Sequence, residues 1–279
     1  KKHYDKGNLK GAYVTYHPTG HKLSDGMVNG IDDYKNLIRD GKWIFWDEKG
    51  ILKEEVHYKK GKREGLTTYF SKTGSESAKM VYKNDQPWFG EWTSWYSDGT
   101  KNESGNYENG QKKSPWMGWF ENGQKKYVIN YQNNKEHGLY TEWTKDGLLT
   151  KDVEYDNGAP ISEYLVEYQG NGYTEINKRN GELSGSWIQW FENGKKNEEG
   201  IYKQGKKGGA WSAWYENGEK KYLAKYVNGK LDGSYTELDI DGRVMKNIIY
   251  DVGEIISEYH VVRDGIGFTE YHKQNGVLD

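Results

Sequence analysis

The chain repeats itself at an offset of 95 residues, without a gap, over residues 90–184 and 185–279. The aligned aromatic pairs are Trp92 and Trp187, Trp95 and Trp190, Trp116 and Trp211, Trp119 and Trp214, Tyr131 and Tyr226, and Tyr155 and Tyr250 (187 − 92 = 95, and likewise for each pair). Such self-similarity constrains the fold, because each unit of a repeat protein buries its apolar surface against the next. We therefore expect one continuous array, with degenerate repeats at 1–89 and two 95-residue blocks at 90–184 and 185–279.

A shorter period of about 23 to 25 residues recurs inside each block. Its unit reads G-x-W-x-x-W-[YF]-x-[ND]-G-x-K, followed by a Tyr-containing segment and a second turn. Clear copies begin at Gly90, Pro115, Gly185 and Ala210, and weaker ones at Gly11, Gly41, Gly65, Gly138 and Gly233. With the irregular segments at 161–184 and 256–279, the chain contains about eleven units.

Each unit is expected to form a β-hairpin. Short segments rich in Trp, Tyr and Thr favour strands, and the Asn-Gly, Asp-Gly or Lys-Gly pair that follows supplies the positive φ of a tight turn. The clearest pairs begin at Asn122, Asn193 and Asn217. Frequent glycine argues against helices. We therefore predict an all-β fold, an elongated and twisted single-layer antiparallel meander of tandem hairpins.

The composition agrees with a thin structure. Only 34% of the residues are hydrophobic, yet 15% are aromatic, including 12 Trp and 24 Tyr. Large rings can bury much area where the surface-to-volume ratio is high. Because a single sheet has no second layer, we expect Trp and Tyr rings to lie on glycines of neighbouring units in its place.

Two tryptophans of one unit, such as Trp92 and Trp95, are three residues apart and cannot share a face of a regular strand. Two alternatives stay open at this point. Either both faces of the sheet carry aromatic rings, or the strand is bulged between the two residues.

The charge balance argues against broad electrostatic partners. The 40 Lys and Arg nearly balance 42 Asp and Glu, so strong attraction to nucleic acid or anionic membrane is not expected. The lack of Cys excludes disulfides and thiolate zinc sites. No apolar run is long enough to span a bilayer. Two locations stay open, the cytoplasm, and the cell envelope with an upstream signal removed.

The repeat resembles the MORN-type repeat, in the bacterial variant of YwqK-family antitoxins. The glycine and aromatic positions that carry the resemblance in the first clear unit are Gly90, Trp92, Trp95, Gly99, Tyr107 and Gly110, with counterparts in later units. The resemblance implies an elongated hairpin array used for binding, with immunity toward a secreted toxin as one context. The insertion at 31–40 and the segments 161–184 and 256–279 depart from the pattern.

No motif for catalysis is present. The sequence contains no nucleophile elbow, phosphate-binding loop, dinucleotide fingerprint or His-Glu-x-x-His motif. Its glycines fall at hairpin spacing, which is typical of turns. We therefore predict no catalytic residue, no enzyme activity and no cofactor.

Two histidine pairs are candidate metal ligands. His17 and His21 flank a turn, and His260 and His272 belong to the last hairpin. Two His ligands lack the third and fourth that zinc requires. We therefore predict no metal site.

The candidate partner-binding residues form two rows. The first is Trp95, Trp119, Trp190 and Trp214, which would hold a peptide, glycan or quaternary amine if it faced outward. We favour a core role, because so polar a chain needs its tryptophans to hold one sheet together. The second row is Lys101, Lys125, Lys196 and Lys220, which would line one edge. It could meet an acidic partner, although a solvated edge is favoured.

We interpret the chain as a non-enzymatic repeat protein that binds another protein, with a toxin as the partner that the resemblance names. The alternative is a cell-envelope module that recognises glycans or choline-like groups through its aromatic rows. If a partner is recognised at defined points, the duplicated segments 161–184 and 256–279 are the first place to look.

Overall fold

Strands and short turns alternate along the whole described chain, and the described residues contain no helix. The computed structural model describes residues 4–5, 8–170, 172–263, 267–274 and 277–278. By contacts between Cα atoms, the chain divides into two compact units, residues 1–138 with 145–147, and residues 139–144 with 148–279. This division falls inside the block 90–184.

Consecutive strands of the first unit pair antiparallel, each with the next along the chain. They are β1 (Tyr4–Asp5), β2 (Asn8–Tyr16), β3 (Lys22–Ile31), β4 (Leu37–Trp46), β5 (Leu52–Lys59), β6 (Lys62–Phe70), β7 (Glu76–Lys83), β8 (Gln86–Trp95), β9 (Lys101–Glu108), β10 (Gln111–Trp119) and β11 (Lys125–Gln132). Strand β12 (Lys135–Trp143) begins in the first unit and ends in the second.

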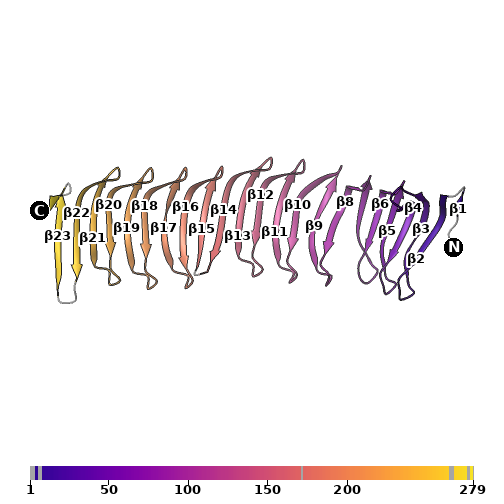
Figure 1. The fold of residues 1–279 in the computed structure, drawn as a ribbon, viewed down its shortest axis with the longest axis horizontal. Coiled ribbons are helices and arrows are strands. Elements are labelled where there is room, and N and C mark those ends of the chain that lie inside the picture. The colour runs from indigo at the N-terminus through magenta and orange to yellow at the C-terminus, as the bar shows by residue number, and fades with distance from the viewer. Residues whose placement is uncertain (1–3, 6–7, 171, 264–266, 275–276, 279) are drawn as a thin grey trace. The chain divides into compact units, whose positions relative to one another are not determined.

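The second unit has the same construction. Its strands are β13 (Leu149–Asp156), β14 (Ala159–Gln169), β15 (Gly172–Arg179), β16 (Glu182–Phe191), β17 (Lys196–Lys203), β18 (Lys206–Trp214), β19 (Lys220–Val227), β20 (Lys230–Leu238), β21 (Val244–Asp251), β22 (Glu254–Arg263), β23 (Phe268–Gln274) and β24 (Val277–Leu278). The predicted all-β antiparallel meander of tandem hairpins is confirmed (Figure 1). Strands β17 to β22 begin 95 residues after β9 to β14 (196 and 101, through 254 and 159).

Two kinds of turn connect the strands. One is a two-residue turn with both residues at positive φ, such as Asn109 (52°) and Gly110 (74°) between β9 and β10. This is the type I′ geometry, whose twist matches that of the paired strands. Asn157 with Gly158 and Asn228 with Gly229 repeat it.

The other turn is longer and contains the Asn-Gly pairs singled out in the sequence. Phe120 N donates to Gln124 O (2.9 Å) and Gly123 N to Phe120 O (2.9 Å), and of the pair only Gly123 has positive φ (82°). The predicted hairpins are confirmed, but the asparagine has a different role from the one expected. Asn122 Nδ2 donates to Lys145 O (3.1 Å), in the turn of the next hairpin. Asn193 and Asn217 bridge to Glu216 O and Ile240 O in the same way.

Tryptophan on glycine forms the core of each sheet, as the sequence predicts. The indole of Trp116 lies against Gly105, that of Trp211 against Gly200, and that of Trp43 against Gly26, so closely that a Cβ on any of these glycines would overlap the ring. The three tryptophans are almost fully buried (0–1% exposed). We call the face that carries these rings in each unit the Trp–Gly face.

A cation covers the outer side of each of these rings. Lys112 Nζ lies 4.1 Å from the ring centroid of Trp116, and Lys207 Nζ 3.6 Å from that of Trp211. Neighbouring rings close the sides, with Trp92 and Tyr107 at 5.4 and 5.3 Å from Trp116. Each indole is thus enclosed by glycine below, rings beside it and an amphipathic lysine above. This arrangement takes the place of a second layer.

The insertion at 31–40 lengthens one hairpin rather than adding an element. Asp32 accepts hydrogen bonds from the backbone N–H groups of Tyr34 (3.0 Å) and Asn36 (2.7 Å), which closes the turn between β3 and β4. Because of these bonds, that of Asn36 first, the pKa of Asp32 lies below its ordinary value. Arg39 then reaches back to cover the ring of Trp43, at 5.0 Å. The insertion therefore supplies the cation that lysine supplies elsewhere.

Replacing Gly200 by alanine should destabilise the second unit by about 1–3 kcal/mol, because the new methyl group overlaps the buried indole of Trp211. Gly208→Ala is the matched control, since a Cβ there meets only the flexible Lys203 side chain, at 3.7 Å. Urea unfolding followed by tryptophan fluorescence measures both. Equal midpoints for the two variants would contradict the role of the glycine.

Replacing Val252 by asparagine should stabilise the chain by about 1 kcal/mol. Val252 has φ of +45°, a conformation unfavourable for a β-branched residue, and its side chain is exposed. Its counterpart 95 residues earlier is Asn157, at φ of +49°. Asn157→Val should lower the unfolding midpoint by a similar amount. A lower midpoint for Val252→Asn would show that backbone conformation is not the controlling factor at this turn.

Candidate functional site

The predicted tryptophan and lysine rows form a single feature. In the first unit Trp95 is the strand partner of Lys101, and Trp119 of Lys125. In the second unit Trp190 pairs with Lys196, and Trp214 with Lys220. Residues directly opposite each other in antiparallel strands project from the same face. Each hairpin therefore presents a tryptophan beside a lysine, and we call this side of each unit the Trp–Lys face.

The Trp–Lys face is opposite the Trp–Gly face of the same unit. The register shift lies in β9, where Asn102 is the extra residue between Glu103, the partner of Ser94, and Lys101, the partner of Trp95. Strand β8 stays regular between its two tryptophans. Trp92 and Trp95 therefore point to opposite faces, and of the two alternatives the first holds. Both faces carry aromatic rings.

Lysine ammonium groups lie against the rings of the Trp–Lys face. Lys101 Nζ is 6.0 Å from the ring centroid of Trp95 and 5.1 Å from that of Trp119. In the second unit, Lys196 Nζ is 5.8 Å from the ring of Trp190. These distances allow cation–π attraction. The lysines thus lie beside the tryptophans of the face rather than apart from them at an edge.

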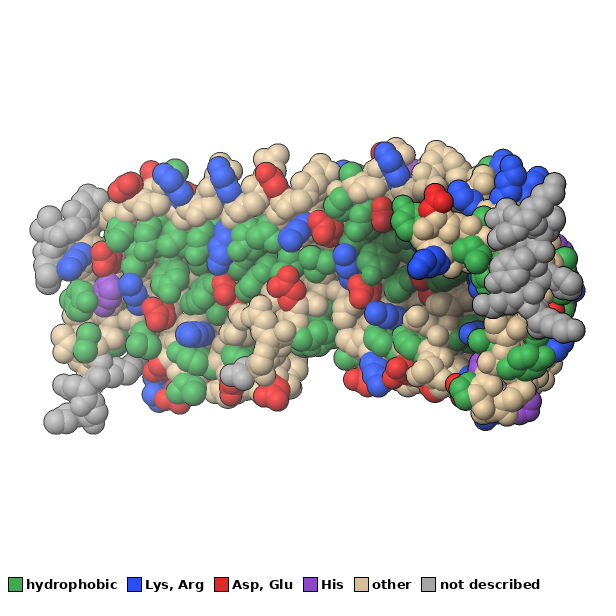
Figure 2. All heavy atoms as spheres, turned by 45° about the vertical axis from the view of Figure 1, so that its right-hand side comes forward, with side chains coloured by type: hydrophobic (Ala, Val, Ile, Leu, Met, Phe, Trp, Pro, Cys, Tyr) green, Lys and Arg blue, Asp and Glu red, His purple; other side chains and the backbone are tan. Residues whose placement is uncertain are grey.

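Exposure separates this row from the core. Trp95 is 50% exposed, whereas Trp119, Trp190 and Trp214 are partly buried. The expectation that the row belongs to the core is therefore wrong for Trp95. The core tryptophans lie between glycine and a cation, whereas no glycine is packed against Trp95 in this way. Figure 2 shows hydrophobic side chains gathered on the visible face, with charged groups among and around them.

An apolar depression of about 520 Å³ surrounds Trp95 in the first unit. Ile51, Leu52 and Phe70 line it together with Trp95. Lys53 and Lys72 stand at its margin, and Lys72 Nζ donates to Ser97 O (3.2 Å). The acidic groups beside it are held in turns, since Asp47 and Asp98 accept hydrogen bonds from backbone N–H groups. The depression therefore combines an apolar lining with charges of both signs, Lys53 and Lys72 with Asp47 and Asp98.

Three rings form a ladder on the Trp–Lys face of the second unit. Tyr168 lies 5.7 Å from Tyr173, and Tyr173 stacks on Trp190 at 5.7 Å and 17°. The ladder depends on the irregular hairpin, because β14 and β15 pair without a bulge from Ser162 and Arg179 to Gln169 and Gly172. The sequence analysis missed the two tyrosines. The signal that could have located them is the absence of the usual turn motif in 161–184.

A second depression on the same face, about 790 Å³ in volume, lies beside this hairpin. Tyr164 is at its centre, with Asp152 on β13 and Asn177 on β15 as strand partners on either side. Asn177 and Tyr173 are four residues apart in a regular stretch of β15, so they share the Trp–Lys face. This depression lies in the segment that the sequence analysis placed first for partner recognition.

The histidines do not form metal sites. His17 Nε2 is 3.1 Å from Trp46 O, and His21 Nδ1 is 3.1 Å from Glu48 O, so both rings join neighbouring turns. His260 and His272 pair with Tyr271 and Tyr259, which puts the two histidines on opposite faces. In the part of the chain that the structure describes, no group of three or more His, Cys, Asp or Glu is arranged to hold a metal ion. Nor does any described segment form a helix able to span a membrane.

Comparison with known families identifies the hairpins. A model of the MORN repeat variant matches residues 39–60, 115–133, 183–204 and 207–228. Each match covers most of two consecutive strands and the longer turn between them, with one tryptophan of each face. The matches support a MORN-repeat protein. The search of curated proteins gave no match.

Two solved structures share low similarity with the chain. The crystal structure of TcdB2-TccC3-Cdc42 is 11% identical over 92% of this chain, with a TM-score of 0.18, and the chain spans 17% of that chain's length. A porin-like protein from Bacteroides uniformis is 12% identical over 83% of this chain and 87% of its own length, with a TM-score of 0.16.

Stability should fall as pH rises from about 10 to about 12. Burial first, and then the charge and hydrogen bond of Glu175, raise the pKa of Tyr164 to about 12. Burial and Glu237 likewise raise the pKa of Tyr235 to about 12. Tyrosine in an unfolded chain has a pKa near 10. As the pH rises from about 10 to about 12, the unfolded state loses these protons before the folded state does, and the free energy of unfolding falls.

Urea unfolding at pH 9, 10 and 11 measures this fall. The double variant Tyr164→Phe with Tyr235→Phe should show a shallower fall than the parent. Absorbance at 295 nm should also show fewer phenols titrating near pH 12 in the variant. A fall of equal slope in both proteins would exclude these two tyrosines as its source.

Proposed function

We propose that this array of MORN-type hairpins is a non-enzymatic protein that binds another protein through its Trp–Lys faces. The observation that supports this most directly is Trp95, a half-exposed indole beside Lys101 in an apolar depression. Exposed aromatic side chains in apolar pockets are typical anchors of protein interfaces. With a volume of about 520 Å³, the depression has room for a side chain presented by a folded partner.

The charges around Trp95 indicate the complementary partner surface. Lys53 and Lys72 line the depression and Lys101 lies beside Trp95, so lysines outnumber the carboxylates of Asp47 and Asp98 there. A partner that presents a large apolar side chain flanked by Asp or Glu would satisfy both features. Such charge complementarity raises association rate and selects the partner more than it adds affinity.

A choline-like ligand fits this face less well. Recognition of a quaternary ammonium requires aromatic faces free to meet the cation. Lysine ammonium groups already lie against the rings of Trp95, Trp119 and Trp190. A second cation would meet like charge there. The cell-envelope alternative is therefore restricted to glycans without a cationic group.

We also propose an identity for the partner. The resemblance of the repeat to that of YwqK-family antitoxins leads us to propose a toxin that this protein neutralises. The idea is tested by expressing this chain together with the toxin candidate that the adjacent reading frame encodes. Growth should be restored by the parent chain and not by Trp95→Ala. Equal growth with and without the parent chain would exclude immunity as the function.

Trp95→Ala should weaken partner binding by about 30-fold or more, as expected for a central aromatic anchor. Because the ring is half exposed, the melting temperature should change little. Tyr34→Ala is the matched control, since Tyr34 is an exposed ring (86%) in a turn of the same unit. The partner is captured from native extract, identified by mass spectrometry, purified and titrated by calorimetry. Equal affinity of the two variants would contradict the proposal.

A further inference from the structure

The second unit contains two grooves that the 95-residue offset relates to each other. The first, of about 790 Å³, is lined by Asp152, Ser162, Tyr164 and Asn177, among others. The second, of about 180 Å³, is lined by their counterparts Asn247, Ser257, Tyr259 and His272. Both lie beside a hairpin of the irregular kind. The duplicated segments therefore form the same surface feature twice.

Strand register arranges the lining residues in two rows across each groove. In the first groove one row is Asp152, Tyr164 and Asn177, and the other is Glu154, Ser162 and Arg179. In the second groove the corresponding rows are Asn247, Tyr259 and His272, and Ile249, Ser257 and Gln274. The central residues of both rows, tyrosine and serine, are the same in the two grooves. The four flanking residues all differ.

At the centre of each groove is a tyrosine ring whose hydroxyl is hydrogen-bonded to a glutamate. Tyr259 Oη donates to Glu270 Oε1 (2.7 Å), and Tyr164 makes the corresponding hydrogen bond to Glu175. Each glutamate is the neighbour of its tyrosine on the adjacent strand of the hairpin. The hydrogen bond holds the ring across the floor of the groove. Serine beside it has a short side chain, which leaves the space between the flanking residues open.

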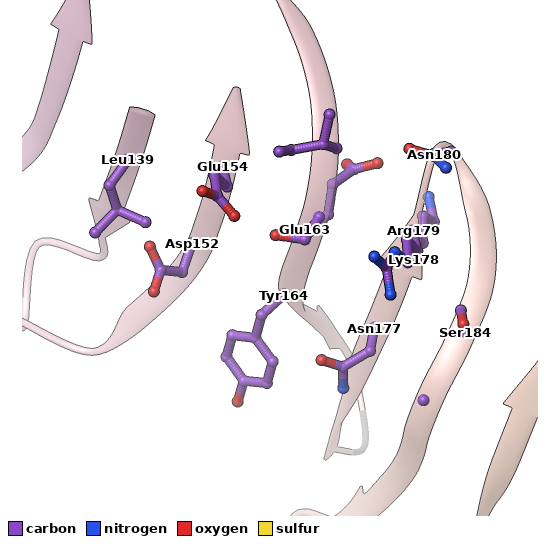
Figure 3. Close-up of a pocket in the computed structure, with 13 residues that line it drawn as sticks. Leu139, Asp152, Glu154, Glu163, Tyr164, Asn177, Lys178, Arg179, Asn180 and Ser184 are labelled. Atoms are coloured by element: carbon purple, nitrogen blue, oxygen red, sulfur yellow. The ribbon is translucent and has the colours of Figure 1, made fainter. Parts of the chain in front are cut away.

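The flanks distinguish the first groove. Glu154 and Arg179 stand on either side of Ser162, two strand spacings or about 10 Å apart. Neither makes a salt bridge with any residue that the structure describes. Figure 3 shows the carboxylates of Asp152 and Glu154 on one side of Tyr164, and Asn177 and Arg179 on the other. Glu163 and Lys178 line the first groove, as Glu258 and Lys273 line the second. The two grooves differ in the flanks of the two rows, where the first has an anionic and a cationic side and the second has no carboxylate, lysine or arginine.

We propose that the first groove binds a partner segment in which a basic and an acidic side chain are two residues apart, and that the second groove does not. Alternate residues of an extended peptide project to one side about 7 Å apart, which fits between flanking strands whose backbones are about 10 Å apart. The basic group would meet Glu154 and Asp152, and the acidic group Arg179 and the amide of Asn177. This inference rests on the proposed function, since it names what a protein partner would present.

The probe is the peptide acetyl-Gly-Arg-Gly-Asp-Gly-amide, added to the ¹⁵N-labelled full chain. Backbone amide signals of Ser162, Tyr164 and Asn177 should shift, with a Kd on the order of 1 mM for so short a ligand. The control peptide, with Gln for Arg and Asn for Asp, should cause no shift of these amide signals. Binding of both peptides alike, or of neither, would overturn the proposal.

The chain itself provides the matched variants. Glu154→Ile with Arg179→Gln gives the serine row of the first groove the flanks of the serine row in the second. It should weaken binding of the charged peptide at least tenfold. Ile249→Glu with Gln274→Arg makes the reverse change, and should give new shifts at Ser257 and Tyr259. All four positions are partly or fully exposed, so both proteins should fold. If neither exchange changes peptide binding, the charges do not select the ligand.

The same variants distinguish this inference from the proposed function. A protein partner that loses affinity with Trp95→Ala but binds Glu154→Ile with Arg179→Gln as tightly as the parent would overturn the groove proposal alone. Loss of partner affinity in the groove variant would support the groove proposal, provided that affinity returns when the charges are exchanged between the groove and the partner segment. The Trp95 depression and the groove are in different units, so the two effects are measured separately.

Discussion

The packing of an indole ring on a glycine is the interaction on which both units depend. A single-layer sheet exposes both faces, so it cannot bury aliphatic side chains between layers. Trp43, Trp116 and Trp211 are buried within the sheet instead. The missing Cβ of Gly26, Gly105 and Gly200 lets each ring lie on the backbone of the preceding strand. Arg39, Lys112 and Lys207 then cover the rings. The result is a fully buried indole at three places in a chain with few hydrophobic residues.

This arrangement leaves the other face available for recognition. Strand alternation places Trp92 and Trp95 on opposite faces, while the bulge at Asn102 lies in the partner strand. One tryptophan of each complete unit is therefore used for packing and the other stands beside a lysine. Removing the bulge, as in the β14–β15 hairpin, changes what the face presents. There a ladder of rings and a charged groove replace the Trp–Lys pair.

Duplication has preserved the packing positions and varied the surface. Between the two grooves the central Ser162 and Tyr164 recur as Ser257 and Tyr259, whereas Glu154 and Arg179 correspond to Ile249 and Gln274. The exposed flanks of a sheet tolerate such changes, because they contribute little to folding. A repeat array can thus acquire sites of different specificity without changing its core.

The sequence by itself determined the class of fold, the hairpin unit and the use of glycine under the rings. These follow from local rules, since spacing sets which residues alternate and which pairs can form turns. Only the tertiary structure decided which strand carries the bulge, and hence that Trp95 stands exposed beside Lys101. It also decided that Asn122 bridges to the next turn and that Tyr168, Tyr173 and Trp190 meet. Each of these depends on the register between strands. Register is set by many side-chain and backbone contacts together, which no single segment of sequence specifies.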